Sequence, residues 1–505
     1  MMLLTALPVL IPLIAGFLLI FASTKSYRLQ RVLNLAIVFG LILLSFKLVN
    51  TSLLGGHQVY LLGNWVAPFG IVFVLDQLSA LMVLITSILA FGALWYAVAT
   101  KADENGSYFH VLFQFQLLGL NGAFMTGDLF NLFVFFEVLL LASYGLLLHG
   151  SGAARTKAGL HYVVINLIGS TLFLFAVGAL YGVLGTLNMA DLAAKISTAP
   201  AENLGLIAAA GLLLLVVFGI KSAMFPLYLW LPNAYSQTSA PVAALFAIMT
   251  KVGIYAIIRV HGTLFGIEAG ELANFYTPWI LGLGLITLAL SALGVSASTV
   301  LREQVAYLVL SSVAILLIGI GINSPAALAA TFYYLIHSTL IAGGLFLLAD
   351  VIARGRGEFQ DQFVTAPSMS SAILVGSFFM FGVVAITGMP PLSGFMGKML
   401  ILSAALDHAW FASILAVVLI AGLLMIIAVA RSGSLMFYNT KEVGEIPGEK
   451  LNAYALLAVI GLFMTGPILV IFANPITAFT ELVAQQQFNN QAYIDAILNT
   501  PAKTE

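Results

Sequence analysis

The sequence of 505 residues contains no cysteine, and only 8% of its residues are charged. Without cysteine there is no disulfide, no thiolate metal site and no iron–sulfur cluster. The formal net charge of −1 leaves no basic surface of the kind that nucleic acid binding requires. No P-loop, HExxH or GxSxG motif appears, and no GxGxxG stands in a strand–helix context. We therefore expect no metal, no cofactor, no nucleic-acid partner and no enzyme activity.

Apolar residues dominate instead. They make up 61% of the chain, whereas a soluble domain carries about 25% charged residues and correspondingly fewer apolar ones. A bilayer core about 30 Å thick is crossed by about 20 apolar residues in a helix. Counting such runs predicts an all-α polytopic membrane protein with fourteen transmembrane helices. The first apolar run is expected to be a membrane helix rather than a removed signal peptide.

Basic residues predict the orientation of these helices. Most of the 19 Lys and Arg residues fall in the loops after odd-numbered helices, and the opposite side holds only Lys47, Lys195, Arg259 and Lys503. Cytoplasmic loops carry the excess of positive charge. The sequence thus predicts a multi-pass protein of a bacterial plasma membrane with both termini on the outer face.

The chain has no loop long enough to form a soluble domain. We predict one transmembrane domain over 1–475, with three helices in 1–105, a five-helix repeat in 106–265, a second in 270–436 and a last helix in 452–475. A polar tail, 476–505, is expected at or beyond the outer surface.

Two helices are expected to be broken in the middle. Lys221 is followed by SAMFPLYLWLP, and Lys398 is preceded by TGMPPLSGFMG. Proline removes a backbone donor and clashes with the preceding turn. Matching Gly/Pro interruptions in two halves of a membrane protein point to inverted repeats with a site at the midplane. Ordinary proline kinks in packed helices are the alternative.

Four ionisable residues lie in these apolar stretches: Glu137, Lys221, Lys251 and Lys398. A charge at the bilayer centre costs on the order of 3 kcal/mol, so such residues are rare and usually functional. One carboxylate cannot neutralise three lysines, and groups that exchange protons suit a proton relay. His337 lies in a helix with several hydroxyl neighbours and is a further candidate. The alternatives are a structural ion pair at Glu137, a snorkelling Lys398 and a packed His337.

Other titratable residues are expected to have simpler roles. Asp76 and Asp128 stand at helix starts, where a carboxylate offsets the helix dipole. His110, His149 and His161 fall near the inner ends of helices, where they line a cytoplasmic entrance or lie among lipid headgroups. Asp350 is expected to be solvated near the inner surface.

Three segments resemble a known family. GDLFNLFVFFEVLLLASYGLL (127–147), GIKSAMFPLYLWLPNAYSQTSAPVAALFAIMTKVGIYAIIR (219–259) and TGMPPLSGFMGKMLI (387–401) are similar to the antiporter-like subunits. This family includes the proton-pumping membrane subunits of respiratory complex I and the large subunits of Mrp cation/proton antiporters. The resemblance extends over essentially the whole chain.

The resemblance implies inverted repeats of helices 4–8 and 9–13, with helices 7 and 12 broken. It also implies a Glu137–Lys221 pair and a proton path that continues through Lys251 and His337 to Lys398. The expected function is a membrane subunit of a multisubunit Na⁺/H⁺ antiporter, with other subunits, lipid, protons and Na⁺ as partners. Two alternatives stay open: a proton-pumping subunit of a redox-driven complex and a scaffold that transports nothing.

Overall fold

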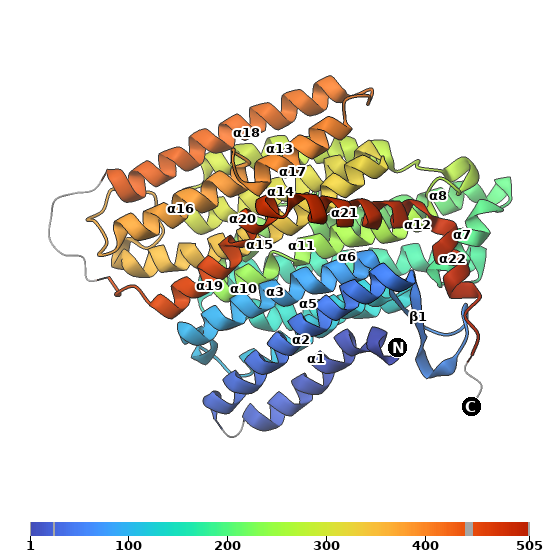
Figure 1. The fold of residues 1–505 in the computed structure, drawn as a ribbon, viewed down its shortest axis with the longest axis horizontal. Coiled ribbons are helices and arrows are strands. Elements are labelled where there is room, and N and C mark those ends of the chain that lie inside the picture. Colours follow the sequence, from blue (N-terminus) through green and yellow to red (C-terminus); the bar gives the residue numbers. More distant parts are fainter. Residues whose placement is uncertain (1, 24–25, 440–447, 503–505) are drawn as a thin grey trace.

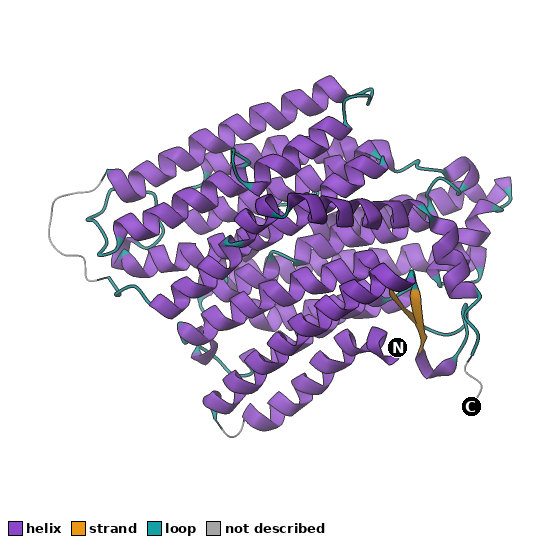
Figure 2. Ribbon diagram, in the orientation of Figure 1, coloured by secondary structure: helices purple, strands orange, loops and turns teal. Residues whose placement is uncertain are grey.

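A computed structural model of the chain describes residues 2–23, 26–439 and 448–502. Long helices run roughly side by side along the molecule and make up nearly all of it (Figures 1 and 2). In the described residues, 12 helices are long and apolar enough to cross a membrane. The prediction of an α-helical, multi-span membrane protein is therefore confirmed. Lys25, Lys441 and Lys503, which entered the charge count, lie outside the described residues.

Three helices and a small hairpin form the N-terminal part. The helices are α1 (Met2–Ser23), α2 (Tyr27–Gly55) and α3 (Gln77–Ala99), and between α2 and α3 lie β1 (Gln58–Leu61), η1 (Leu62–Asn64) and β2 (Val72–Leu75). The strands pair antiparallel, with Gln58 opposite Leu75. Asp76 begins α3 as predicted: its Oδ1 accepts the Ser79 N–H at 2.8 Å, and the Ser79 hydroxyl accepts the Asp76 N–H at 2.9 Å. This reciprocal cap satisfies backbone donors at the helix start.

The next part contains the first predicted break. Its elements are η2 (Ala102–Glu104), α4 (Phe109–Met125), α5 (Leu129–Leu148), α6 (Ala153–Leu184), α7 (Met189–Ser197), α8 (Ala201–Ser222), α9 (Trp230–Gln237), α10 (Ala240–Phe246), α11 (Met249–Ala256), the π-helical turn η3 (Ile257–His261), α12 (Gly262–Leu264) and η4 (Gly270–Leu272). Asp128 begins α5 as predicted, because its Oδ1 accepts the Asn131 N–H at 2.8 Å. The run from α10 to α12 is buried almost throughout.

The second predicted break lies in the following part. Its elements are α13 (Thr277–Ala297), α14 (Leu301–Ile322), α15 (Pro325–Gly355), η5 (Gly357–Phe359), α16 (Ala372–Thr387), α17 (Ser393–Ala404), α18 (Phe411–Gly433) and η6 (Ser434–Tyr438). Helices α14 and α15 carry buried residues around their whole circumference. These two helices therefore form the interior of this part of the bundle, with α13, α16 and α18 outside them.

Four helices close the chain: α19 (Ala453–Phe463), α20 (Thr465–Ile471), α21 (Ala473–Phe488) and α22 (Asn490–Leu498). The polar residues from 476 onward thus form α21 and α22, which pack along α15 and against α7. The start of α1 and the end of α22 lie toward the same end of the bundle, where β1 and α7 also lie (right in Figure 1). We call this the terminal end.

The two breaks have the same local geometry. Helix α8 ends before Ala223, whose φ is 60°, and α16 ends before Gly388, whose φ is 79°. In each case the next residue reaches back five positions: Met224 N–H to Gly219 O at 2.8 Å, and Met389 N–H to Val384 O at 3.0 Å. This is the Schellman ending, which satisfies carbonyls that the helix leaves free. Pro226 and Pro391 each follow three residues after the left-handed residue.

One basic residue is placed differently from the prediction. Arg259 was counted among the basic residues of the outer side, but it lies within η3 and is only 3% exposed. The helical run continues past it to Leu264 because the π-helical turn carries the chain on without a break. Arg259 is therefore not a surface charge on that side of the membrane. The orientation of the helices in the membrane stays a prediction, because the 12 long helices are identified by length and composition alone.

Candidate functional site

Lys221 stands on the last turn of α8, at the first break. It is 7% exposed. Its Nζ donates a hydrogen bond to Asn166 Oδ1 on α6 at 3.2 Å and lies 6.0 Å from the centre of the Phe136 ring. The carbonyl of the neighbouring Ile220 accepts the indole N–H of Trp230 at 3.0 Å. Trp230 thus bonds the carbonyl next to Lys221, and the Lys221 ammonium extends toward α6 instead.

Hydrogen bonds through α6 connect Glu137 with Lys221. The Ser170 hydroxyl donates to Glu137 Oε1 and also contacts the Asn166 backbone carbonyl, one turn away. Among the ion pairs within 4.0 Å in the described residues, none joins Glu137 to Lys221. In this structure Ser170 and Asn166 of α6 stand between the two side chains of the pair implied by the resemblance, Glu137 and Lys221. Helix spacing puts Asn166 and Ser170 on one face.

Lys251 lies on α11 and is completely buried. Its Nζ donates to the Ser312 hydroxyl on α14 at 3.1 Å. Two residues further along α11, Gly253 contacts the end of α8 so closely that a Cβ would lie 2.6 Å from Ser222 N and 2.9 Å from the Lys221 carbonyl carbon. Only glycine fits this approach. The helix that carries Lys251 and the break that carries Lys221 are therefore in backbone contact.

His337 and Lys398 meet at the second break. The His337 Nδ1 lies 2.8 Å from the Ser393 hydroxyl at the start of α17, and the imidazole is completely buried. Lys398, 8% exposed, donates from Nζ to the Thr387 carbonyl at 2.6 Å. This is the carbonyl that the end of α16 leaves free. The Lys398 ammonium therefore points into the break between α16 and α17.

The predicted residues lie on five elements: Glu137 on α5, Lys221 at the end of α8, Lys251 on α11, His337 on α15 and Lys398 on α17. Helix α6 connects α5 with α8, and α14 connects α11 with α15. Each of the predicted residues except Glu137 is less than 10% exposed. We call this set the lysine row. Sequence reasoning missed the polar groups that touch the row, which are Asn166, Ser170, Ser312 and Ser393. Only Asn166 and Ser170 gave a signal, as polar residues four apart in an apolar helix.

The chemistry of the row suits protons better than metal cations. Lysine offers no oxygen ligand, and hard cations need oxygen ligands. In the described residues, no group of three or more His, Asp or Glu side chains is arranged to hold a metal ion. Each cationic group touches a hydroxyl, an amide or a carbonyl oxygen, to which its proton is directed.

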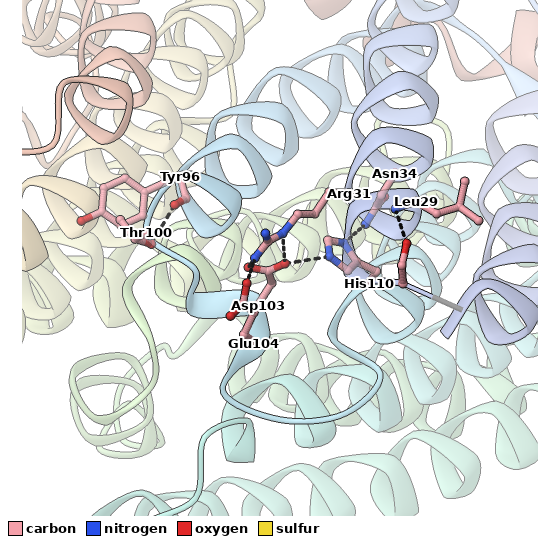
Figure 3. A network of polar contacts seen from close by, with 9 residues as sticks. Leu29, Arg31, Asn34, Tyr96, Thr100, Asp103, Glu104 and His110 are labelled. Carbon is pink, nitrogen blue, oxygen red and sulfur yellow. Dashed lines mark hydrogen bonds and ion pairs between the residues drawn. The ribbon is translucent and has the colours of Figure 1, made fainter. Parts of the chain in front are cut away.

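A second polar network, with Asn34, Asp103 and His110 buried in it, joins α2, η2 and α4 (Figure 3). Arg31 on α2 binds Asp103 through Nε at 2.7 Å and Glu104 through Nη2 at 2.6 Å. His110 lies between Asp103, at 3.1 Å, and Asn34, at 2.8 Å. Burial raises the pKa of Asp103, but the hydrogen bonds from His110 and Arg31 outweigh burial and leave the pKa below its usual value. Of the two roles predicted for His110, neither headgroup contact nor an open entrance fits this buried position.

Comparisons with known proteins identify the family. Residues 126–424 match the family described as NADH:quinone oxidoreductase/Mrp antiporter, transmembrane. The chain is 38% identical to the D-type subunit of a probable K⁺/H⁺ antiporter from Rhizobium meliloti, over 98% of this chain and 97% of that protein. It is 36% identical to the D-type subunit of the Na⁺/H⁺ antiporter of Bacillus subtilis, over 97% and 98%.

Solved structures give the same result. A chain of the Mrp complex from Dietzia sp. DQ12-45-1b superposes with a TM-score of 0.87 at 26% identity, covering 99% of this chain and 100% of that one. A chain of respiratory complex I from Thermus thermophilus has a TM-score of 0.75 at 25% identity, covering 96% and 99%. By sequence and by fold, this chain belongs to the NADH:quinone oxidoreductase/Mrp antiporter family of membrane proteins.

Proposed function

We propose that this chain is the D-type subunit of a multisubunit antiporter that exchanges a monovalent cation for protons, and that the lysine row carries the protons. The observation that supports this most strongly is the position of three lysines and a histidine at or between two helix breaks, each beside a polar partner. The Rhizobium meliloti and Bacillus subtilis relatives are antiporter subunits at 38% and 36% identity, whereas the complex I chain is 25% identical. This difference favours exchange over redox-driven pumping.

The topology follows as part of the proposal. The 12 long helices, the shorter α4 and the broken pair α16–α17 together give the fourteen predicted crossings. The equal Schellman endings at α8 and α16 support two related halves with broken helices 7 and 12. With the terminal end outside, the basic residues of the opposite end face the cytoplasm, in keeping with the positive-inside rule.

In the proposed mechanism, Glu137 and Lys221 act through α6. When Glu137 is ionised it favours the charged form of Lys221, and when Glu137 is protonated or withdrawn Lys221 releases its proton more readily. The proton then passes through water and the hydroxyl partners to Lys251, His337 and Lys398. Na⁺ or K⁺ crosses elsewhere in the complex, since the row offers cations no carboxylate cage.

Everted vesicles test this proposal. The whole complex is expressed in an antiporter-deficient host, and Na⁺-driven and K⁺-driven changes in ΔpH are recorded separately. We expect Lys221→Ala to lower the response at least tenfold while the complex still assembles. Lys195→Ala, which changes a half-exposed lysine at the terminal end, is the matched control and is expected to retain the response. Full antiport by an assembled Lys221→Ala complex would remove this chain from the proton path.

A further inference from the structure

A buried ion pair lies at the terminal end, outside the lysine row. Arg259 on η3 forms an ion pair with Asp76, with 2.5 Å between Nη2 and Oδ2, and both side chains are less than 5% exposed. A buried pair contributes little net stability because removing two charges from water is costly. Inside a membrane protein, such residues by default have a function besides packing.

Two tyrosines enclose the guanidinium. The carbon Cζ of Arg259 lies 5.5 Å from the ring centre of Tyr255 and 5.3 Å from that of Tyr493. Tyr255 belongs to the same helical run and accepts a hydrogen bond from Arg259 Nε at 3.2 Å. Tyr493 comes from α22, near the other end of the sequence. We call Asp76, Arg259, Tyr255 and Tyr493 the terminal cluster.

The C-terminal helices are bonded to both sides of this cluster. Asn490 Nδ2 donates to the Gly262 carbonyl of α12 at 2.8 Å, and Gln486 Oε1 accepts the Gln77 N–H at the start of α3 at 2.9 Å. Tyr493 is 3% exposed, and a Cβ on Gly127 would lie 3.3 Å from its hydroxyl oxygen. The hydrogen bonds of Asn490 and Gln486, together with the close approach to Gly127, therefore hold the Tyr493 ring over Arg259.

The terminal cluster stands between Lys251 and the terminal end. Arg259 follows Lys251 by eight residues in the same helical run, which places it about 12 Å further along the helix axis. Spacing of four residues puts Lys251, Tyr255 and Arg259 on one side of that helix. A proton leaving Lys251 along its own helix toward the terminal end would therefore meet the cluster.

We propose that the terminal cluster closes this direct route, so that a proton on Lys251 leaves only along the row toward His337 and Lys398. Arginine keeps its charge at every relevant pH, and a fixed guanidinium in a pore opposes the passage of protons and cations. Asp76 fixes the guanidinium, and the two tyrosine rings exclude water around it. The inference rests on the proposed function in one respect, namely that Lys251 carries protons.

Passive proton leak tests the closure without any cation gradient. Vesicles containing the complete complex are given an acid jump in buffer free of Na⁺ and K⁺, and an internal pH dye follows the decay of ΔpH. We expect Tyr493→Ala to raise the decay rate at least threefold, because the ring that covers Arg259 is gone. Tyr493→Phe keeps the ring, and the Tyr493 hydroxyl has no hydrogen-bond partner in the described residues, so the closure should hold. Asp495→Asn, an exposed change on the same helix, is the control.

A double variant separates a leak through the row from general damage. Adding Lys251→Met to Tyr493→Ala should return the decay to the wild-type rate, because the proton then has no carrier. The proposal is overturned by a wild-type leak in the assembled Tyr493→Ala complex, or by a leak that persists in the double variant. If Tyr493→Ala does not assemble, Tyr493→Leu takes its place with the same expectations.

The outcome is independent of the antiport assay. A leak that depends on Lys251, together with full antiport by Lys221→Ala, would contradict the proposed role of Lys221 and leave the closure standing. Loss of antiport in Lys221→Ala, together with no leak in Tyr493→Ala, would contradict the closure alone.

Discussion

The two broken helices end in the same way, but different side chains bond the carbonyls of their last turns. At the end of α8, the indole of Trp230 bonds the Ile220 carbonyl, and Lys221 extends to Asn166 on another helix. At the end of α16, Lys398 itself bonds the Thr387 carbonyl. Lys221 therefore bonds a side chain of another helix, whereas Lys398 bonds the backbone of its own break. Equal backbone geometry does not imply equal roles for the charged side chains beside it.

The largest expected effect separates the two lysines. Lys221→Met and Lys398→Met should each lower cation-driven proton movement at least tenfold, since both remove a proton carrier from the row. Lys398→Met leaves a fixed, buried backbone carbonyl without its donor, which costs about 1–3 kcal/mol, whereas Lys221→Met leaves the Asn166 side-chain oxygen, which can rotate toward another donor. Thermal denaturation of the purified complex in detergent should rank Lys398→Met below Lys221→Met. Equal denaturation temperatures would contradict the structural role of Lys398.

The left-handed residues at the breaks give the next largest effect. Gly388→Ala places a Cβ 2.8 Å from Lys398 Cδ at a φ of 79°. Left-handed backbone alone costs a non-glycine residue about 1–2 kcal/mol. The reverse substitution, Ala223→Gly, relieves this strain but also increases the conformational entropy of the unfolded chain. Because the two effects oppose each other, we expect the free energy of unfolding to change by no more than about 0.5 kcal/mol. The same denaturation assay should show a clear loss for Gly388→Ala and almost none for Ala223→Gly, and similar losses at both would show that the breaks are equivalent.

Trp230→Phe should have a smaller effect on stability than Gly388→Ala. The Ile220 carbonyl loses the indole donor but keeps the Ala223 N–H at 3.2 Å, so the expected loss of stability is about 1 kcal/mol. Trp279→Phe, which changes an exposed tryptophan, is the control for the loss of ring volume. A loss for Trp230→Phe as large as that for Lys398→Met would mean that the tryptophan, too, is essential to its break.

Much of the architecture follows from local sequence rules. Apolar runs predict the long helices, and the Pro and Gly residues near 226 and 391 predict the breaks, because proline cannot continue a helix. The candidate residues Lys221, Lys251 and Lys398 could be found because charge is rare in apolar segments. Their mutual arrangement could not be read from one sequence, since it depends on which helices pack together.

The missed features share a physical reason. Ser312 and Ser393 look like ordinary hydroxyls in helices, and only their contacts with Lys251 and His337 reveal them. Arg259 was counted as an outer-side charge because a charge near a predicted helix end resembles a surface residue, and its partner Asp76 lies far away in the sequence. Tyr493 gave no signal, because the polar residues around it resemble a solvated tail.

The contact at Gly253 has a mechanical consequence. With no side chain at that position, the end of α8 rests directly on α11, backbone against backbone. A rigid contact of this kind transmits displacement, since neither surface has a rotamer that can absorb it. We expect the first break and the helix of Lys251 to move as one lever. A small displacement of Lys221 at α6 would then also displace Lys251 relative to Ser312, in addition to any transfer of charge between the two lysines.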